Sequence, residues 1–88
     1  MTTAATEAPT VEDILAISRV RDLTVTGRAR ALREAAHLSQ GDIAAVCDTT
    51  ISAVSRWEKG RTRVPRSRAV VYARILAELE ARAAEERA

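Results

Sequence analysis

The sequence predicts an all-α fold, a compact bundle of five helices with an extra N-terminal helix and a long C-terminal helix. Only three Gly and two Pro occur in 88 residues, so the chain has few natural breaks. Hydrophobic residues make up 47% of the chain but include one Trp, one Tyr and no Phe, which indicates an aliphatic core. Apolar residues also recur at helical spacing. We expect one domain over 10–88 and a disordered N-terminus over 1–9.

Two helices are expected in the first part of the chain. The first, over about 11–22, begins at the capping-box-like segment Thr10-Val11-Glu12-Asp13. Residues 23–27, which are rich in β-branched side chains and end in Gly, are expected to break the helix before a second one over about 28–37. Helical spacing assigns to the interior Val11, Ile14, Leu15 and either Ile17 or Ser18, followed by Ala29, Leu32, Ala35 and Ala36.

Residues 38–60 predict two short helices joined by a tight turn. Ser39 is a favourable N-cap, Asp48-Thr49-Thr50 interrupts the apolar pattern, and the second helix, about 50–59, ends at Gly60. The expected inward residues of the pair are Ile43, Ala44, Cys47, Val54 and Trp57. The opposite side of the second helix carries small and basic side chains, namely Ile51, Ser52, Ser55, Arg56 and Lys59. A helix with such a face has about the width of a DNA major groove.

Positive charge is concentrated in the middle of the chain. Residues 26–75 hold ten basic residues against four acidic ones, whereas the segments on either side are net acidic. Four arginines follow Gly60 within eight residues, and Pro65 prevents a helix until just before the third of them: Arg61, Arg63, Arg66 and Arg68. From charge alone, a polyanionic partner and an ordinary solvated face both remain open.

The last helix, over about 66–86, has two apolar seams. Val71 and Ile75 are expected to face the core. The second seam comprises Tyr72, Leu76, Leu79 and Ala83. This seam must cover a second surface, which is either the N-terminal helix or another copy of the chain.

Several kinds of function are not expected from this sequence. The single Cys47 cannot form an internal disulfide and is expected to be a buried apolar residue, which fits a cytoplasmic protein. His37 has no partners at metal-ligand spacing, and no Cys/His pair or Gly-rich phosphate loop occurs. No apolar run approaches the ~20 residues of a membrane span. We therefore expect no enzyme activity, no cofactor, no metal, no small-molecule ligand and no membrane partner.

The segment ALREAAHLSQGDIAAVCDTTISAVSRWEKG resembles the helix-turn-helix of the lambdoid-phage repressor/Cro (XRE) family. The similarity covers about 28–75, and GRTRVPR resembles the basic loop that follows the recognition helix in phage repressors. The resemblance implies an ion pair between Arg33 and Glu58, and a core position for Trp57. One departure is Asp48, where the family commonly has Gly.

The resemblance also implies which residues contact DNA. The base-reading residues would be Ile51, Ser52, Ser55 and Arg56. The residues contacting the DNA backbone would be Gln40, Thr50, Lys59, Arg61, Thr62, Arg63 and Arg66, the last of them over the minor groove.

The expected function is that of a sequence-specific double-stranded DNA-binding transcriptional regulator, Cro-like or a repressor, acting as a homodimer on a two-fold symmetric operator. Such a protein would lie with the nucleoid of a prokaryote, or be phage-encoded in the host cytoplasm. No ligand-binding domain fits into 88 residues beside this one, which favours control by occupancy alone. The alternative is an antitoxin or phage accessory protein whose fold mainly binds another protein, through the seam of the last helix.

Overall fold

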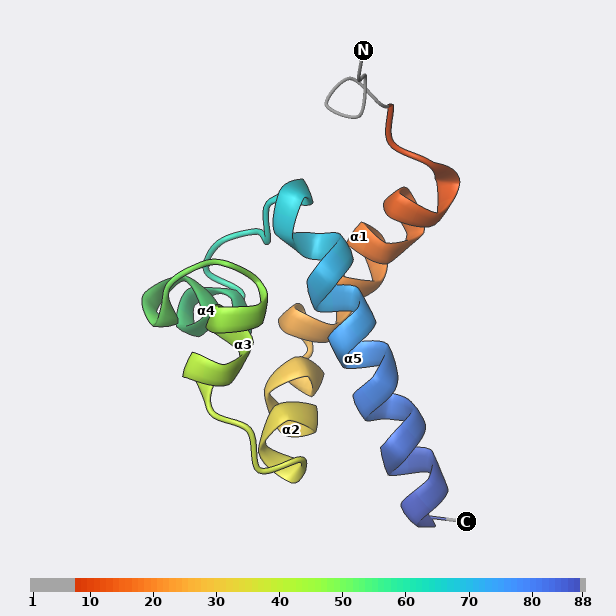
Figure 1. The fold of residues 1–88 in the computed structure, drawn as a ribbon, viewed down its shortest axis with the longest axis vertical. Helices are drawn as coiled ribbons and strands as arrows, with labels where there is room; N and C mark the ends of the chain where they lie inside the picture. Colours follow the sequence, from red (N-terminus) through yellow and green to blue (C-terminus); the bar gives the residue numbers. More distant parts are fainter. Residues whose placement is uncertain (1–7, 88) are drawn as a thin grey trace.

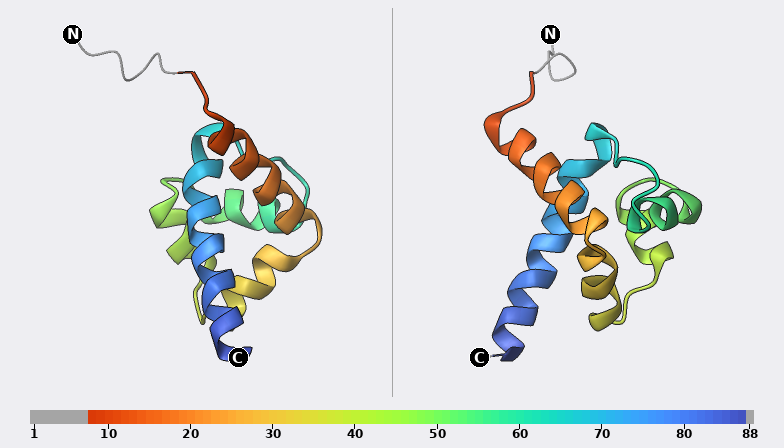
Figure 2. Two further views of the ribbon diagram at one scale, coloured as in Figure 1. Left: turned by 90° about the vertical axis from the view of Figure 1, so that its right-hand side faces the viewer. Right: turned by 180° about the vertical axis from the view of Figure 1, so that it is seen from behind.

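The computed structural model describes residues 8–87, which form five helices and no strand. The helices are α1 (Val11–Val25), α2 (Arg28–Ala35), α3 (Gln40–Val46), α4 (Ile51–Glu58) and α5 (Arg66–Arg87). The long α5 runs along the molecule, with α1 crossing it and α3 and α4 lying together on one side (Figures 1 and 2). The predicted all-α, five-helix architecture is therefore confirmed. The predicted disorder of 1–9 falls mostly outside the described residues.

Side-chain caps begin three of the helices where the sequence predicts helix starts. Thr10 and Asp13 form a reciprocal capping box at α1, and Ser39 and Asp42 form another at α3. The Thr50 hydroxyl accepts a hydrogen bond from the third backbone N–H of α4 at 3.1 Å. These bonds satisfy N–H groups that have no partner within the helix, so the boundaries follow from short-range chemistry.

Helix α1 differs from its prediction in both length and orientation. It continues through the expected break, because Leu23 and Thr24 are buried in its last turn. Three of the residues predicted to face inward are instead exposed, Val11 by 69%, Ile14 by 58% and Leu15 by 63%, whereas Ile17 is buried as one of the two predicted alternatives had it. The first turns of α1 extend beyond the body of the molecule (Figure 1). The buried face of α1 consists of Ile17, Val20, Leu23 and Thr24.

Helix α5 contributes more buried apolar residues to the core than any other helix. Most of them belong to the second apolar seam, not to the one that was predicted to face the core. Tyr72, Leu76 and Leu79 are buried, whereas Val71 and Ile75 are half-buried at its edge. Helix α5 packs on α1 and α2. The seam was predicted to cover either the N-terminal helix or another copy of the chain. It packs within its own chain, so the first alternative is the correct one. The suggestion that the seam is free to bind another protein is wrong.

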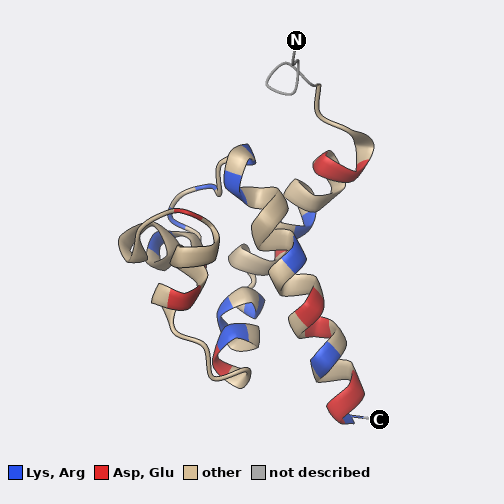
Figure 3. Ribbon diagram, in the orientation of Figure 1, with Lys and Arg blue, Asp and Glu red and all other residues tan. Residues whose placement is uncertain are grey.

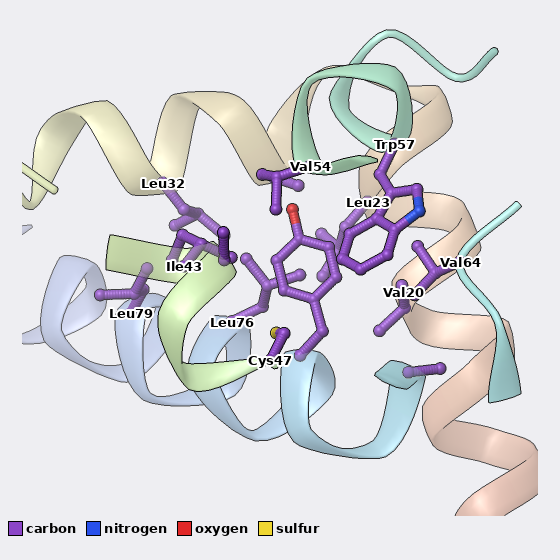
Figure 4. Close-up of a cluster of buried hydrophobic side chains, with 14 of the residues drawn as sticks. Val20, Leu23, Leu32, Ile43, Cys47, Val54, Trp57, Val64, Leu76 and Leu79 are labelled. Carbon is purple, nitrogen blue, oxygen red and sulfur yellow. The ribbon is translucent and has the colours of Figure 1, made fainter. Parts of the chain in front are cut away.

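The centre of the core lies where α4, α5 and α1 meet (Figure 4). Val54 and Trp57 point inward from α4, and the Trp57 ring lies 5.5 Å from the ring of Tyr72, centroid to centroid. Val64, in the loop before α5, is also buried here, and no helical pattern predicts that. Burial of one such side chain stabilises the fold by ~1.5–3 kcal/mol. The core therefore holds α4 through the residues on its inner face, and it holds the following loop through Val64.

Candidate nucleic-acid interface

The turn between α3 and α4 sets the angle between the two helices. Asp48 adopts a left-handed backbone conformation, with φ of +56°, at the position where the resemblance implies Gly. Asp is one of the few residues with a side chain that occupy this region readily. The Thr49 N–H then donates to the Ala44 carbonyl at 2.9 Å and closes the turn. The predicted inward residues Ile43, Cys47 and Val54 are all buried, so the predicted helix–turn–helix geometry is confirmed.

Helix α4 presents its opposite face to solvent. Ile51 is 57% exposed, Ser52 and Arg56 are exposed, and Ser55 is half-buried. An exposed isoleucine on an eight-residue helix has no role in this chain's core, because the inner face already provides Val54 and the Trp57 ring. The four predicted base-reading residues therefore lie on one side of one short helix.

A buried carboxylate fastens α4 to the two preceding helices. Glu58 accepts hydrogen bonds from Arg33 Nε at 2.6 Å and Arg33 Nη2 at 3.0 Å. It also accepts one from Gln40 Nε2 at 3.0 Å, and Arg33 Nη1 donates to the Leu38 carbonyl at 2.9 Å. The hydrogen bonds to Glu58 raise the pKa of the Arg33 guanidinium. The ion pair implied by the resemblance is present, and it joins α2, the start of α3 and the end of α4.

Gln40 is the first residue of α3, the position that the resemblance implies for it, and its side chain also contacts Glu58. Its side chain is half-buried, and its amide donates one hydrogen bond to Glu58. An amide NH₂ group has two donors, so one hydrogen remains for another acceptor. Gln40 therefore connects the first turn of α3 to the end of α4.

The segment after α4 is a basic loop held at both ends. Gly60, with φ of +69°, ends the helix, and Val64 is buried in the core. Between them, Arg61, Thr62 and Arg63 are all exposed. The two anchors limit how far the three side chains can move from the end of α4, so the loop extends the outward face of that helix.

Among the described residues, the cations around α4 have no carboxylate partner, whereas three arginines elsewhere in the chain do. Arg19 pairs with Glu80, Arg30 with Glu34 at 3.0 Å, and Arg33 with Glu58. Within residues 8–87, no ion pair involves the basic residues of the interface, namely Arg56, Lys59, Arg61, Arg63 and Arg66. Lys and Arg mark the loop and the start of α5, whereas most acidic residues of α5 lie in its C-terminal half (Figure 3). The interface is therefore a region of uncompensated positive charge.

The predicted backbone-contacting residues do not all lie together. Thr50 and Lys59 are the caps of α4, and the loop residues follow directly. Arg66 is exposed at the start of α5, where it lines hollows beside Pro9 and Ile14 of the N-terminal region. Another residue, Arg21 of α1, lines a hollow with the basic loop. Sequence reasoning missed Arg21 because it counted that residue with the acidic N-terminal segment.

Other kinds of site find no support in the described residues. No group of three or more His, Cys, Asp or Glu residues in that range could hold a metal ion. No helix among residues 8–87 combines the length and the apolar character needed to cross a membrane. The thiol of Cys47 is buried, which raises its pKa and keeps it protonated at neutral pH.

The chain matches a known protein family. A family described as a helix-turn-helix domain matches residues 24–88, which include α2 to α5. Neither a curated protein nor a solved structure matches the chain.

Proposed function

Because the chain belongs to the helix-turn-helix domain family, we propose that it is a sequence-specific transcriptional regulator that reads the major groove of double-stranded DNA with α4. Family membership supports a DNA-binding regulator in general. The observation that carries the finer proposal is the division of α4 into two faces. Val54 and Trp57 hold the helix in the core, while Ile51, Ser52 and Arg56 extend into solvent among unpaired cations.

Each outward side chain of α4 suits a different feature of a base pair. Arg56 can donate two hydrogen bonds to O6 and N7 of guanine, the commonest specific contact in the major groove. Ile51 has no donor or acceptor and suits the methyl group of thymine. Ser52 can donate or accept, so it discriminates weakly between bases. Most of the hydrogen-bonded specificity is therefore assigned to Arg56.

The surrounding residues suit the sugar–phosphate backbone. Lys59, Arg61 and Arg63 supply charge, and Thr62 and Thr50 supply hydroxyl donors. The start of α3 offers free backbone N–H groups, and Gln40 retains one amide hydrogen there. Arg66 is assigned a position over the minor groove beside the site. These contacts fix the helix in the groove without reading sequence.

We propose further that the regulator is Cro-like or a repressor and that it binds a two-fold symmetric operator as a homodimer. One α4 reaches only a few base pairs, and pairing two copies across half-sites one helical turn apart gives useful specificity. The mass in solution tests this, since a stable dimer is expected. The alternative, a protein that mainly binds another protein, was expected to use the seam of α5 as its binding surface. Tyr72, Leu76 and Leu79 of that seam are buried within the chain, so they are not open to a partner.

Selection of bound sequences from random duplexes tests the function directly. The intact chain is expected to enrich a motif with two related halves, and Arg56→Ala is expected to lose preference at one position per half, by ~1–3 kcal/mol. Arg63→Ala is expected to weaken all sequences alike. Arg82→Ala, at an exposed position in the last turns of α5, is the control and should leave the motif unchanged. Absence of any enriched motif, or equal effects of Arg56→Ala and Arg63→Ala on every sequence, would contradict the proposal.

A further inference from the structure

A basic hollow lies between the end of α1 and the loop that follows α4. Its volume is about 300 Å³. Its lining combines three arginines with small and polar residues and contains no carboxylate: Arg21, Thr24, Val25, Gly60, Arg61, Thr62 and Arg63. The two walls lie close together, since a Cβ added to Gly60 would lie 3.9 Å from the Val25 Cα atom. The hollow therefore joins a helix at the N-terminal end of the chain to the loop beside the outward face of α4.

Arg21 is held in this hollow without a partner of its own. Its side chain is half-buried, and its Nε atom is shielded from solvent with no hydrogen-bond partner among the described residues. No ion pair in that part of the chain involves Arg21. The neighbouring Asp22 is exposed and lines an adjoining hollow together with Arg21, but the two side chains form no ion pair. By contrast Arg19, two positions earlier on α1, pairs with Glu80 of α5. The terminal nitrogens of Arg21 also make no hydrogen bond among the described residues, but they are not shielded, so an anion entering the hollow can accept from them.

We propose that Arg21 completes a phosphate-binding site with Arg61 and Arg63, and that this site takes one phosphate of the DNA backbone next to the groove that α4 enters. A guanidinium group matches a phosphate by two parallel hydrogen bonds, and Thr62 adds a hydroxyl donor to the same hollow. This inference rests on the proposed function. It assigns a role to α1, which lies largely outside the part of the chain that matches the helix-turn-helix family.

The dependence of DNA affinity on salt measures the number of phosphates contacted. The affinity of the intact chain, Arg21→Ala, Arg21→Lys and Arg63→Ala is compared for one selected and one random duplex over 50–200 mM salt. Loss of one phosphate contact reduces the slope of log affinity against log salt by about 0.9. For Arg21→Ala we expect that reduction with both duplexes, and for Arg21→Lys we expect most of the slope to remain. Arg19→Ala, which removes the same charge from the same helix, should leave the slope unchanged.

Duplexes with one neutral methylphosphonate at a time locate the contact. One position should weaken the intact chain but have little further effect on Arg21→Ala, and it should lie beside or coincide with the position coupled to Arg63. An unchanged slope for Arg21→Ala, with Arg63→Ala still reducing it, would overturn the phosphate site but leave the proposed function standing. Failure of the intact chain to bind any duplex would overturn both. Circular dichroism of each variant shows that it is folded at the temperature of the binding assay.

Discussion

Replacing Glu58 by Ala is expected to lower the free energy of unfolding by ~3–5 kcal/mol, the usual cost of removing one partner from a buried ion pair. The Glu58 side chain is only 2% exposed and accepts three hydrogen bonds, two from Arg33 and one from Gln40. After truncation, the Arg33 guanidinium, 11% exposed, keeps only the Leu38 carbonyl as an acceptor from this network. Gln40 is half-buried and can turn to water, so most of the cost arises at Arg33.

The loss is large for a domain of this size, whose total stability is expected to be ~5–10 kcal/mol. The melting temperature should therefore fall by at least ~12 °C, taking ~4 °C per kcal/mol. Glu58→Gln keeps one oxygen acceptor but leaves the Arg33 charge uncompensated and places an NH₂ donor against Arg33 or Gln40, so it should cost nearly as much, ~3 kcal/mol. The double replacement of Arg33 by Met and Glu58 by Leu removes both charges, and should recover much of the loss seen with Glu58→Ala. Thermal and urea denaturation followed by far-UV circular dichroism measure all three variants.

Two results would refute this reasoning about the buried pair. One is a loss below ~1 kcal/mol for Glu58→Ala, a value typical of a solvent-exposed ion pair. The other is a double variant at least as unstable as Glu58→Ala, which would mean that packing alone, rather than an orphaned charge, sets the cost. Arg19→Ala breaks an ion pair on the exterior and is the matched control, with a much smaller effect that salt screens.

Four further variants test individual features of the fold by denaturation. Tyr72→Phe removes a buried hydroxyl that has no hydrogen-bond partner among residues 8–87, so stability should be unchanged or rise by ~1 kcal/mol, and a clear loss would reveal a partner. Asp42 accepts a hydrogen bond from the Ser39 N–H, which lowers the pKa of its carboxyl below the ordinary 3.8. The stability that the Asp42 carboxylate contributes should be complete above about pH 3.8, and it should be lost as pH falls through the lower pKa of the folded state. Asp42→Asn should abolish this part of the pH dependence of unfolding. Gly41→Ala places its Cβ in ordinary contact, 3.5 Å from an Ile51 carbon, and should stabilise α3 by about 0.5 kcal/mol. Gly60→Ala requires a left-handed alanine and should cost ~1–2 kcal/mol; a gain would contradict its φ of +69°.

Local chemistry made part of this structure predictable. The caps at Thr10, Ser39 and Thr50, and the stop at Gly60, depend on groups within a few residues of one another. For the same reason, the alternation of buried and exposed residues along α3 and α4 follows from helical spacing. The outward face of α4 was therefore predictable residue by residue. Its role in base recognition remains a prediction.

Features that depend on distant segments were not predictable in the same way. The apolar stripe of α1 at Val11, Ile14 and Leu15 fits a buried face by spacing, but no other helix in the described part of the chain covers it. The two seams of α5 are equally plausible by pattern, and only the packing of α1 and α2 selects the one containing Tyr72. The position of Arg21 beside the basic loop also depends on how α1 crosses the bundle. Spacing along one helix carries no information about its neighbours.

The division of α4 into two faces separates the residues that hold the fold from those proposed to read DNA. The residues that hold the helix, Val54 and Trp57, share no position with those that extend outward, Ile51, Ser52 and Arg56. Exchanges at the outward positions remove no core contact, so a lineage carrying this scaffold can acquire a new target sequence without first acquiring extra stability. New specificities can then diverge by single codon changes, and a library randomised at those three positions should yield mostly folded members.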